Sequence, residues 1–128
     1  MYLDGRGVPQ SDTEAARWLR RAAEQSNARA QNNLGTLYAS GRGLPQDLDE
    51  ARHWFERAAA LGSLEGQVNL GLLHARGIGV PTDRHQAELW YARANAHAPD
   101  PTPASLRELR RAIEALPEGE DTPAVSSD

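Results

Sequence analysis

The chain has 128 residues, of which 39% are hydrophobic and 25% charged, with a formal net charge of −4 and no cysteine. The absence of cysteine excludes disulfides and thiolate chemistry, and no apolar run approaches the ~20 residues of a membrane-spanning helix. Residues 1–98 contain 11 arginines and 11 acidic residues, whereas residues 99–128 contain 3 arginines and 7 acidic residues. The neutral first part argues against nucleic-acid binding, which depends on clustered positive charge.

A motif of two glycines and a proline recurs every 36 residues. It occupies residues 5–9, 41–45 and 77–81, and a tryptophan keeps the same step at Trp18, Trp54 and Trp90. One fixed spacing of this length predicts a helical repeat protein, in which each unit covers the apolar face of the next.

The chain begins inside a repeat, because Met1 falls at the phase of Leu37 and Leu73. Either the true start therefore lies upstream or the chain is a piece of a longer array. A signal peptide could have preceded Met1, so the compartment stays open between cytoplasm and periplasm. All basic residues are arginine, and alanine and glycine are abundant, which is typical of a GC-rich bacterial genome.

Each glycine–proline motif predicts a helix end followed by a helix start. Glycine can adopt the positive φ of a helix C-cap, and proline cannot continue the helix. The segments that follow fit capping boxes, at Ser11-x-x-Glu14, Asp47-x-x-Glu50 and Asp83-x-x-Gln86. We expect the second helix of each unit to start at these positions.

The second helices carry an apolar stripe at helical spacing, which predicts a buried face. In one copy the stripe is Ala51, Trp54, Phe55, Ala58 and Ala59; in the preceding copy it is Ala15, Trp18, Leu19, Ala22 and Ala23. The first helices are expected over Ala28–Ser40 and Leu64–Arg76. Gly35 and Gly71 lie in the middle of these helices at one phase, which indicates close contact with a neighbouring helix.

After the repeats comes a proline-rich linker and one more predicted helix, over residues 104–116. Its apolar residues are Leu106, Leu109, Ile113 and Leu116. We expect this helix to cap the last repeat and the acidic residues 117–128 to be disordered. Arg107, Arg110 and Arg111 could bind an anion, but Glu108 and Glu114 flank them and favour a solvated face.

From Ala30 to Ala59 the chain reads A-x-x-x-L-G-x-L-Y-x-x-G-x-G-L-P-x-D-x-x-x-A-x-x-W-F-x-x-A-A. This pattern resembles the Sel-one-like repeat, a relative of the tetratricopeptide repeat. The resemblance covers a partial unit at 1–27, a full unit at 28–63 and a diverging unit at 64–98. It implies an all-α, right-handed solenoid of antiparallel helix pairs, to which the linker and capping helix at 99–116 are added.

The resemblance implies a non-enzymatic adaptor that holds a partner protein or peptide on the concave side, which the first helices line. The candidate contact residues are Arg29, Asn32, Thr36 and Ser40 in one unit and Glu65, Val68, Leu72 and Arg76 in the next. As an alternative, the helix over 104–116 folds back and covers this patch. Both interpretations stay open at this point.

Two further functions are weighed against the adaptor. The partial repeat at 1–27 leaves Tyr2, Leu3, Trp18 and Leu19 uncovered, so it could stack on another copy of the chain. Some relatives of the repeat family are linked to β-lactam binding, but this chain contains no lysine and therefore no Ser-x-x-Lys nucleophile.

The four histidines do not predict a metal site. They are His53, His74, His85 and His97. Beyond His85-x-x-Glu88 they show no paired ligand spacing, and such helical pairs are common by chance. We expect no metal and no cofactor.

Overall fold

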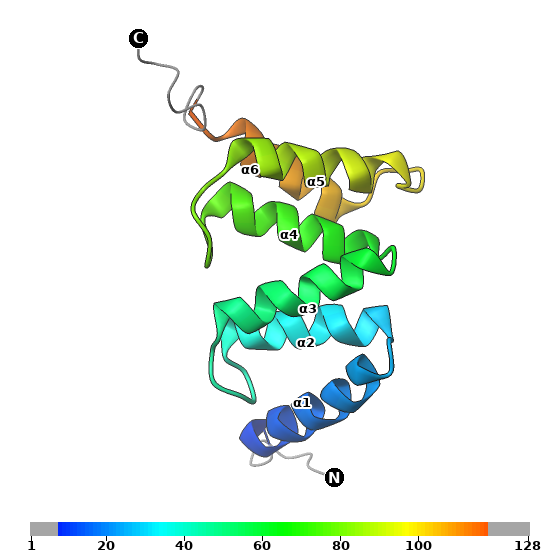
Figure 1. Cartoon of the computed structure of the whole chain (residues 1–128), viewed down its shortest axis with the longest axis vertical. Coiled ribbons are helices and arrows are strands. Elements are labelled where there is room, and N and C mark those ends of the chain that lie inside the picture. Colours follow the sequence, from blue (N-terminus) through cyan, green and yellow to red (C-terminus); the bar gives the residue numbers. More distant parts are fainter. Residues whose placement is uncertain (1–7, 118–128) are drawn as a thin grey trace. The chain divides into compact units, whose positions relative to one another are not determined.

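The computed structural model describes residues 8–117, and their side chains from residue 13 onward. Its helices are α1 (Val8–Glu24), α2 (Ala28–Ser40), α3 (Leu48–Ala60), α4 (Leu64–Arg76), α5 (Arg84–Ala96) and α6 (Ala104–Glu114), as Figure 1 shows. The described residues contain no strand, which confirms the all-α class. The chain divides into two compact units, Met1–Gly66 and Gln67–Asp128, which are described in turn.

In the first unit, local signals set the ends of α2 and the start of α3. The Asn27 side chain accepts a hydrogen bond from the Ala30 amide and caps α2, which ends at Gly41 in the left-handed region (φ 78°). After the glycine–proline loop, the Asp47 carboxylate accepts from the backbone N–H groups of Asp49 and Glu50 and caps α3. The predicted helix end and helix start are confirmed here.

Asp47→Ala is expected to lower the free energy of unfolding by about 0.5–2 kcal/mol, because two backbone amides lose their acceptor. Both hydrogen bonds to the Asp47 carboxylate measure 3.1 Å. The matched control is Asp49→Ala in the same turn, which removes only an exposed ion pair and is expected to cost less than about 1 kcal/mol. Urea unfolding followed by circular dichroism measures both; equal losses would contradict the capping role of Asp47.

The core of the first unit lies between α2 and α3. All five residues of the predicted α3 stripe are buried, and α2 contributes Ala30, Leu34 and Tyr38. A Cβ on Gly35 would lie 2.6 Å from Cε1 of Phe55, so the aromatic ring occupies the space that a side chain would need. The predicted close contact at this glycine is confirmed.

Helix α1 departs from the prediction in two ways. It begins at Val8 rather than at Ser11, so Pro9 lies in the first turn, where its missing N–H costs nothing, and Ser11 is not a cap. Gly5 and Gly7 lie outside the described residues. On its predicted stripe Ala23 is buried, but Ala15 is exposed and Trp18 is 63% exposed.

Helix α1 packs on α2 through a different set of residues than α3 does. The Gln31 amide donates to the Ala23 carbonyl oxygen at 3.0 Å, and the Arg20 guanidinium donates to the Tyr38 hydroxyl. Ala16 and Ala23 are the buried alanines of α1. The same stripe is therefore fully buried in α3 and only partly buried in α1, although both follow one sequence pattern.

The second unit contains most of α4 together with α5 and α6. The Asp83 carboxylate caps α5 by accepting a hydrogen bond from the backbone N–H of Gln86 at 3.1 Å. Leu106, Leu109 and Ile113 of α6 are buried, and a Cβ on Gly71 would lie 2.6 Å from Cδ2 of Leu109. The predicted helix is confirmed over Ala104–Glu114, so it ends before Leu116, which is half-buried outside it, and α6 packs against α4. Its capping role and the handedness of the solenoid stay predictions, and the predicted disorder of the tail falls outside the described residues.

Candidate binding surfaces

Helix α2 presents one accessible row along its whole length. Arg29, Thr36 and Ser40 are exposed and Asn32 is half-buried, because the opposite side of the helix is in the core. Positions three and four apart share a face of a helix, so these four side chains lie in one line. The predicted row of the first unit is therefore open to solvent.

Two hydroxyl groups of this row donate hydrogen bonds to backbone carbonyl oxygens of α2 itself. Thr36 Oγ1 donates to the Asn32 carbonyl oxygen at 3.1 Å, and Ser40 Oγ donates to that of Leu37 at 3.3 Å. Both hydroxyl oxygens can still accept a hydrogen bond from a ligand. The Arg29 side chain has no hydrogen bond or ion pair with any other described residue, so its guanidinium can bind a carboxylate.

The corresponding row on α4 is not open throughout. Glu65 is exposed and Leu72 half-buried, whereas Val68 is fully buried. Val68 therefore cannot contact a partner, which corrects its assignment to the surface. Buried residues extend over most of the circumference of α4, at Val68, Leu70, Leu73 and Ala75, and leave only a narrow side with Glu65 and Leu72 accessible. A one-sided periodicity cannot identify the exposed face of such a helix.

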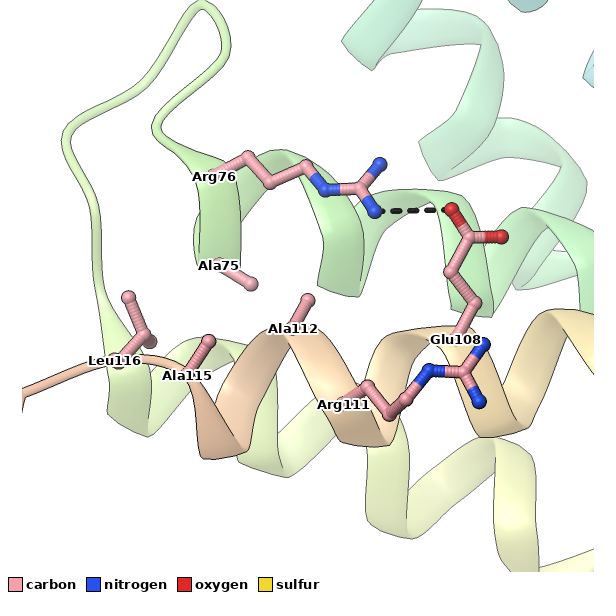
Figure 2. Close-up of a pocket in the computed structure, with 7 residues that line it drawn as sticks. All are labelled: Ala75, Arg76, Glu108, Arg111, Ala112, Ala115 and Leu116. Carbon is pink, nitrogen blue, oxygen red and sulfur yellow. Dashed lines mark hydrogen bonds and ion pairs between the residues drawn. The ribbon is translucent and has the colours of Figure 1, made fainter.

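Arg76, the last residue of the α4 row, is held by α6. Its Nη2 lies 2.9 Å from Oε2 of Glu108, and both side chains are about half exposed. Figure 2 shows this ion pair reaching from α4 to α6. It supports, for Arg76, the alternative in which the helix over 104–116 folds back on the patch.

A groove of about 560 Å³ runs between the C-terminal ends of α4 and α6. Its lining residues, shown in Figure 2, are Ala75, Arg76, Glu108, Arg111, Ala112, Ala115 and Leu116. Three alanines leave space in the groove, and the charged groups come from two arginines and one glutamate. The lining includes no hydroxyl, thiol or imidazole group that could act as a nucleophile or general base.

Each tryptophan of the repeats is stacked by an arginine three residues later, a feature that the sequence interpretation missed. The guanidinium carbon lies 5.5 Å from the ring centroid in Arg21–Trp18, 4.6 Å in Arg57–Trp54 and 4.7 Å in Arg93–Trp90. Such cation–π pairs contribute about 0.5–1 kcal/mol each at exposed sites. The signal was present in the sequence as W-x-x-R in all three copies.

The exposed Trp18 marks another accessible surface on the first unit. A shallow groove of about 330 Å³ is lined by Trp18, Arg21, Ala22 and Gln25. Leu19 is half-buried, while Tyr2 and Leu3 lie outside the described residues. The apolar surface expected at this end is thus present at Trp18.

The part of the chain that the structure describes contains no group of three or more histidine, aspartate or glutamate side chains placed to hold a metal ion. None of its helices is long and apolar enough to cross a membrane. The hydrogen bond to Glu114 raises the pKa of Arg110 above its ordinary value, with Tyr91 adding to the effect, so Arg110 stays cationic.

Helices α2 to α5 are of equal length and are joined by loops that recur every 36 residues, which defines a helical repeat protein. The family model of the Sel1 repeat matches residues 1–27, 28–63 and 64–97. The chain therefore belongs to the Sel1 repeat family, whose members typically serve as scaffolds for protein–protein interaction.

Two solved structures resemble the chain. A Sel1 repeat protein from Oxalobacter formigenes is 37% identical, with a TM-score of 0.66, over 73% of this chain and 38% of that protein. A protective antigen of uropathogenic Escherichia coli strains, with an SLR fold, is 32% identical, with a TM-score of 0.70, over 80% of this chain and 21% of that protein. The chain thus spans less than two fifths of either. A comparison with curated proteins found no match.

Proposed function

We propose that this chain is a non-enzymatic interaction scaffold that binds a partner protein or peptide through the accessible row on α2. The observation that carries the proposal is the contrast between the two sides of this helix. The row from Arg29 to Ser40 is accessible, while Gly35 on the other side is packed against the Phe55 ring. Packing of this kind holds a surface in one conformation and lowers the entropy cost of binding.

The chemistry of the row favours a peptide that carries an acidic side chain. Arg29 offers a guanidinium without a partner, and the hydroxyl oxygens of Thr36 and Ser40 can accept from peptide N–H groups. On α4, Glu65 and Leu72 are proposed as additional contacts, without Val68, which is buried. Arg76 would have to leave Glu108 in order to take part.

A comparative pull-down from lysate of the source cells tests this proposal. The double variant Arg29→Glu, Thr36→Glu reverses the charge of the row and places a larger side chain at its centre, and the control Ala60→Glu changes an exposed position on α3. We expect a protein that is retained by the native chain and the control to be lost from the double variant, with affinity reduced about tenfold or more.

Two other outcomes would contradict the proposal. Recovery of the same partners by all three chains would show that the row does not bind them. Recovery of only further copies of this chain, equally by all variants, would favour the second candidate function, self-association. That candidate rests on the 63% exposure of Trp18.

A further inference from the structure

The groove between α4 and α6 shares only Arg76 with the proposed scaffold surface, and it has a distinct chemistry. Figure 2 shows alanines from both helices facing the groove, with Arg76 and Glu108 joined near one end. In the described part of the chain the Arg111 guanidinium has neither a hydrogen bond nor an ion pair. The groove thus combines free space with one uncommitted positive charge.

The neighbouring arginines of the second unit are committed elsewhere. Arg107 donates to the Thr102 carbonyl oxygen at 2.9 Å, and Arg110 pairs with Glu114 at 3.1 Å. Arg84 donates to the Leu116 carbonyl oxygen at 3.2 Å. This last contact fixes the point at which the chain leaves α6, and Leu116 itself lines the groove.

The segment that follows has the opposite charge. Residues 118–128 contain four acidic residues, Glu118, Glu120, Asp121 and Asp128, and no basic residue. Arg111 lies five residues before Leu116, about 8 Å back along the helix axis. Five extended residues span up to about 17 Å, so the first three acids can return to Arg111.

We propose that residues 118–128 of this chain bind in the α4–α6 groove, with the Glu118–Asp121 carboxylates facing Arg111. The attachment point at the edge of the groove makes the contact intramolecular, which raises the effective concentration of the segment without any additional contact. An external acidic peptide would then have to displace the chain's own tail before it could bind there.

Two features of the groove oppose this binding and keep it weak. Glu108 places a carboxylate on the groove wall, but its charge is offset by Arg76 at 2.9 Å. The C-terminal ends of α4 and α6 carry partial negative charge, an effect that falls off within the last turn. Arg111 lies in the last turn of α6. Its guanidinium is nevertheless the one charged group of the groove lining that forms no ion pair with another described residue.

Paramagnetic relaxation in the full-length chain tests the proposal. Because the chain has no cysteine, Ser127→Cys introduces a single attachment site for a nitroxide label. The amides of Ala112 and Ala115 report the proximity of the tail. The control carries the same label with Glu118→Gln, Glu120→Gln and Asp121→Asn, which keeps the length and the tether while removing the charge.

We expect relaxation enhancement at Ala112 to be about threefold larger with the acidic tail than with the neutral tail, the population change that one or two exposed ion pairs produce. Arg111→Glu should reduce the enhancement to the level of the neutral tail, and so should ~1 M salt, where the Debye length is about 3 Å. Arg111 is exposed, so this change leaves the packing of α6 intact.

Equal enhancement with both tails, or enhancement that survives Arg111→Glu, would overturn the proposal. A mixture of isotope-labelled chain without nitroxide and unlabelled chain with nitroxide distinguishes the source of the tail. Enhancement in that mixture as large as in the single chain would show that the groove binds the tail of a second copy, which contradicts the intramolecular contact.

Discussion

Trp54→Ala is expected to lower the free energy of unfolding by about 3–5 kcal/mol, as truncation of a buried aromatic side chain does. Trp54 is 4% exposed and has the guanidinium of Arg57 stacked 4.6 Å from its ring centroid. Trp18 has the same place in the repeat but is 63% exposed, so Trp18→Ala is expected to cost less than about 1 kcal/mol. Urea unfolding followed by circular dichroism measures both.

Trp54→Phe separates loss of the ring from loss of its polar group. The Nε1–H of Trp54 is buried and has no hydrogen-bond partner among the described residues. Replacement by phenylalanine keeps most of the apolar volume and removes this unsatisfied donor. We therefore expect the free energy of unfolding to fall by less than about 2 kcal/mol. Equal losses for the alanine variants at positions 18 and 54 would contradict the described burial.

Gly35→Ala is expected to lower the free energy of unfolding by about 1–3 kcal/mol, even though alanine is the better helix former. The new Cβ would lie 2.6 Å from Phe55 Cε1 and 3.1 Å from the backbone oxygen of Ala51. Phe55 is 3% exposed and a backbone atom cannot turn aside, so neither neighbour can yield. Chemical unfolding at equilibrium gives the free energy.

Two further variants identify the cause of this loss. Gly71→Ala is the matched helical control, because the atoms nearest to its Cβ are the methyl carbons of Leu109, and we expect a smaller loss there. Phe55→Leu combined with Gly35→Ala should cost less than the sum of the two single changes, since the clash is removed. A Gly35→Ala chain that is more stable by about 1 kcal/mol, as helix propensity alone predicts, would refute the packing argument.

The bounds of α2 and α4 were predicted to the residue because helix ends depend on local chemistry. Gly41 has the positive φ that a helix end favours, and Asp47 caps the next helix with its own carboxylate. The same glycine and aspartate signals recur in successive repeats, so the helix ends predicted in one repeat support those predicted in the other. The spacing of Leu106, Leu109 and Ile113 likewise predicted the buried face of α6.

One local prediction failed, and predictions that depended on a neighbouring helix were less successful. Ser11 fits a capping box, but α1 starts at Val8 because a proline is tolerated in a first turn. Val68 was assigned to the surface by periodicity, yet α4 is buried over most of its circumference and Val68 is on the buried part. The pairing of Arg76 with Glu108 joins residues 32 positions apart, and no local pattern indicates such a contact.

Site-specific photo-crosslinking at position 36 tests the scaffold function most directly. A photoreactive residue in place of Thr36 lies in the middle of the accessible row on α2, and the same residue in place of Ala60 on α3 is the matched control. We predict a crosslink to one partner protein from position 36 that is absent from position 60 and is lost when Arg29→Glu is added. Equal crosslinking from both positions, or none from position 36 to a partner that the native chain retains, would contradict binding through α2.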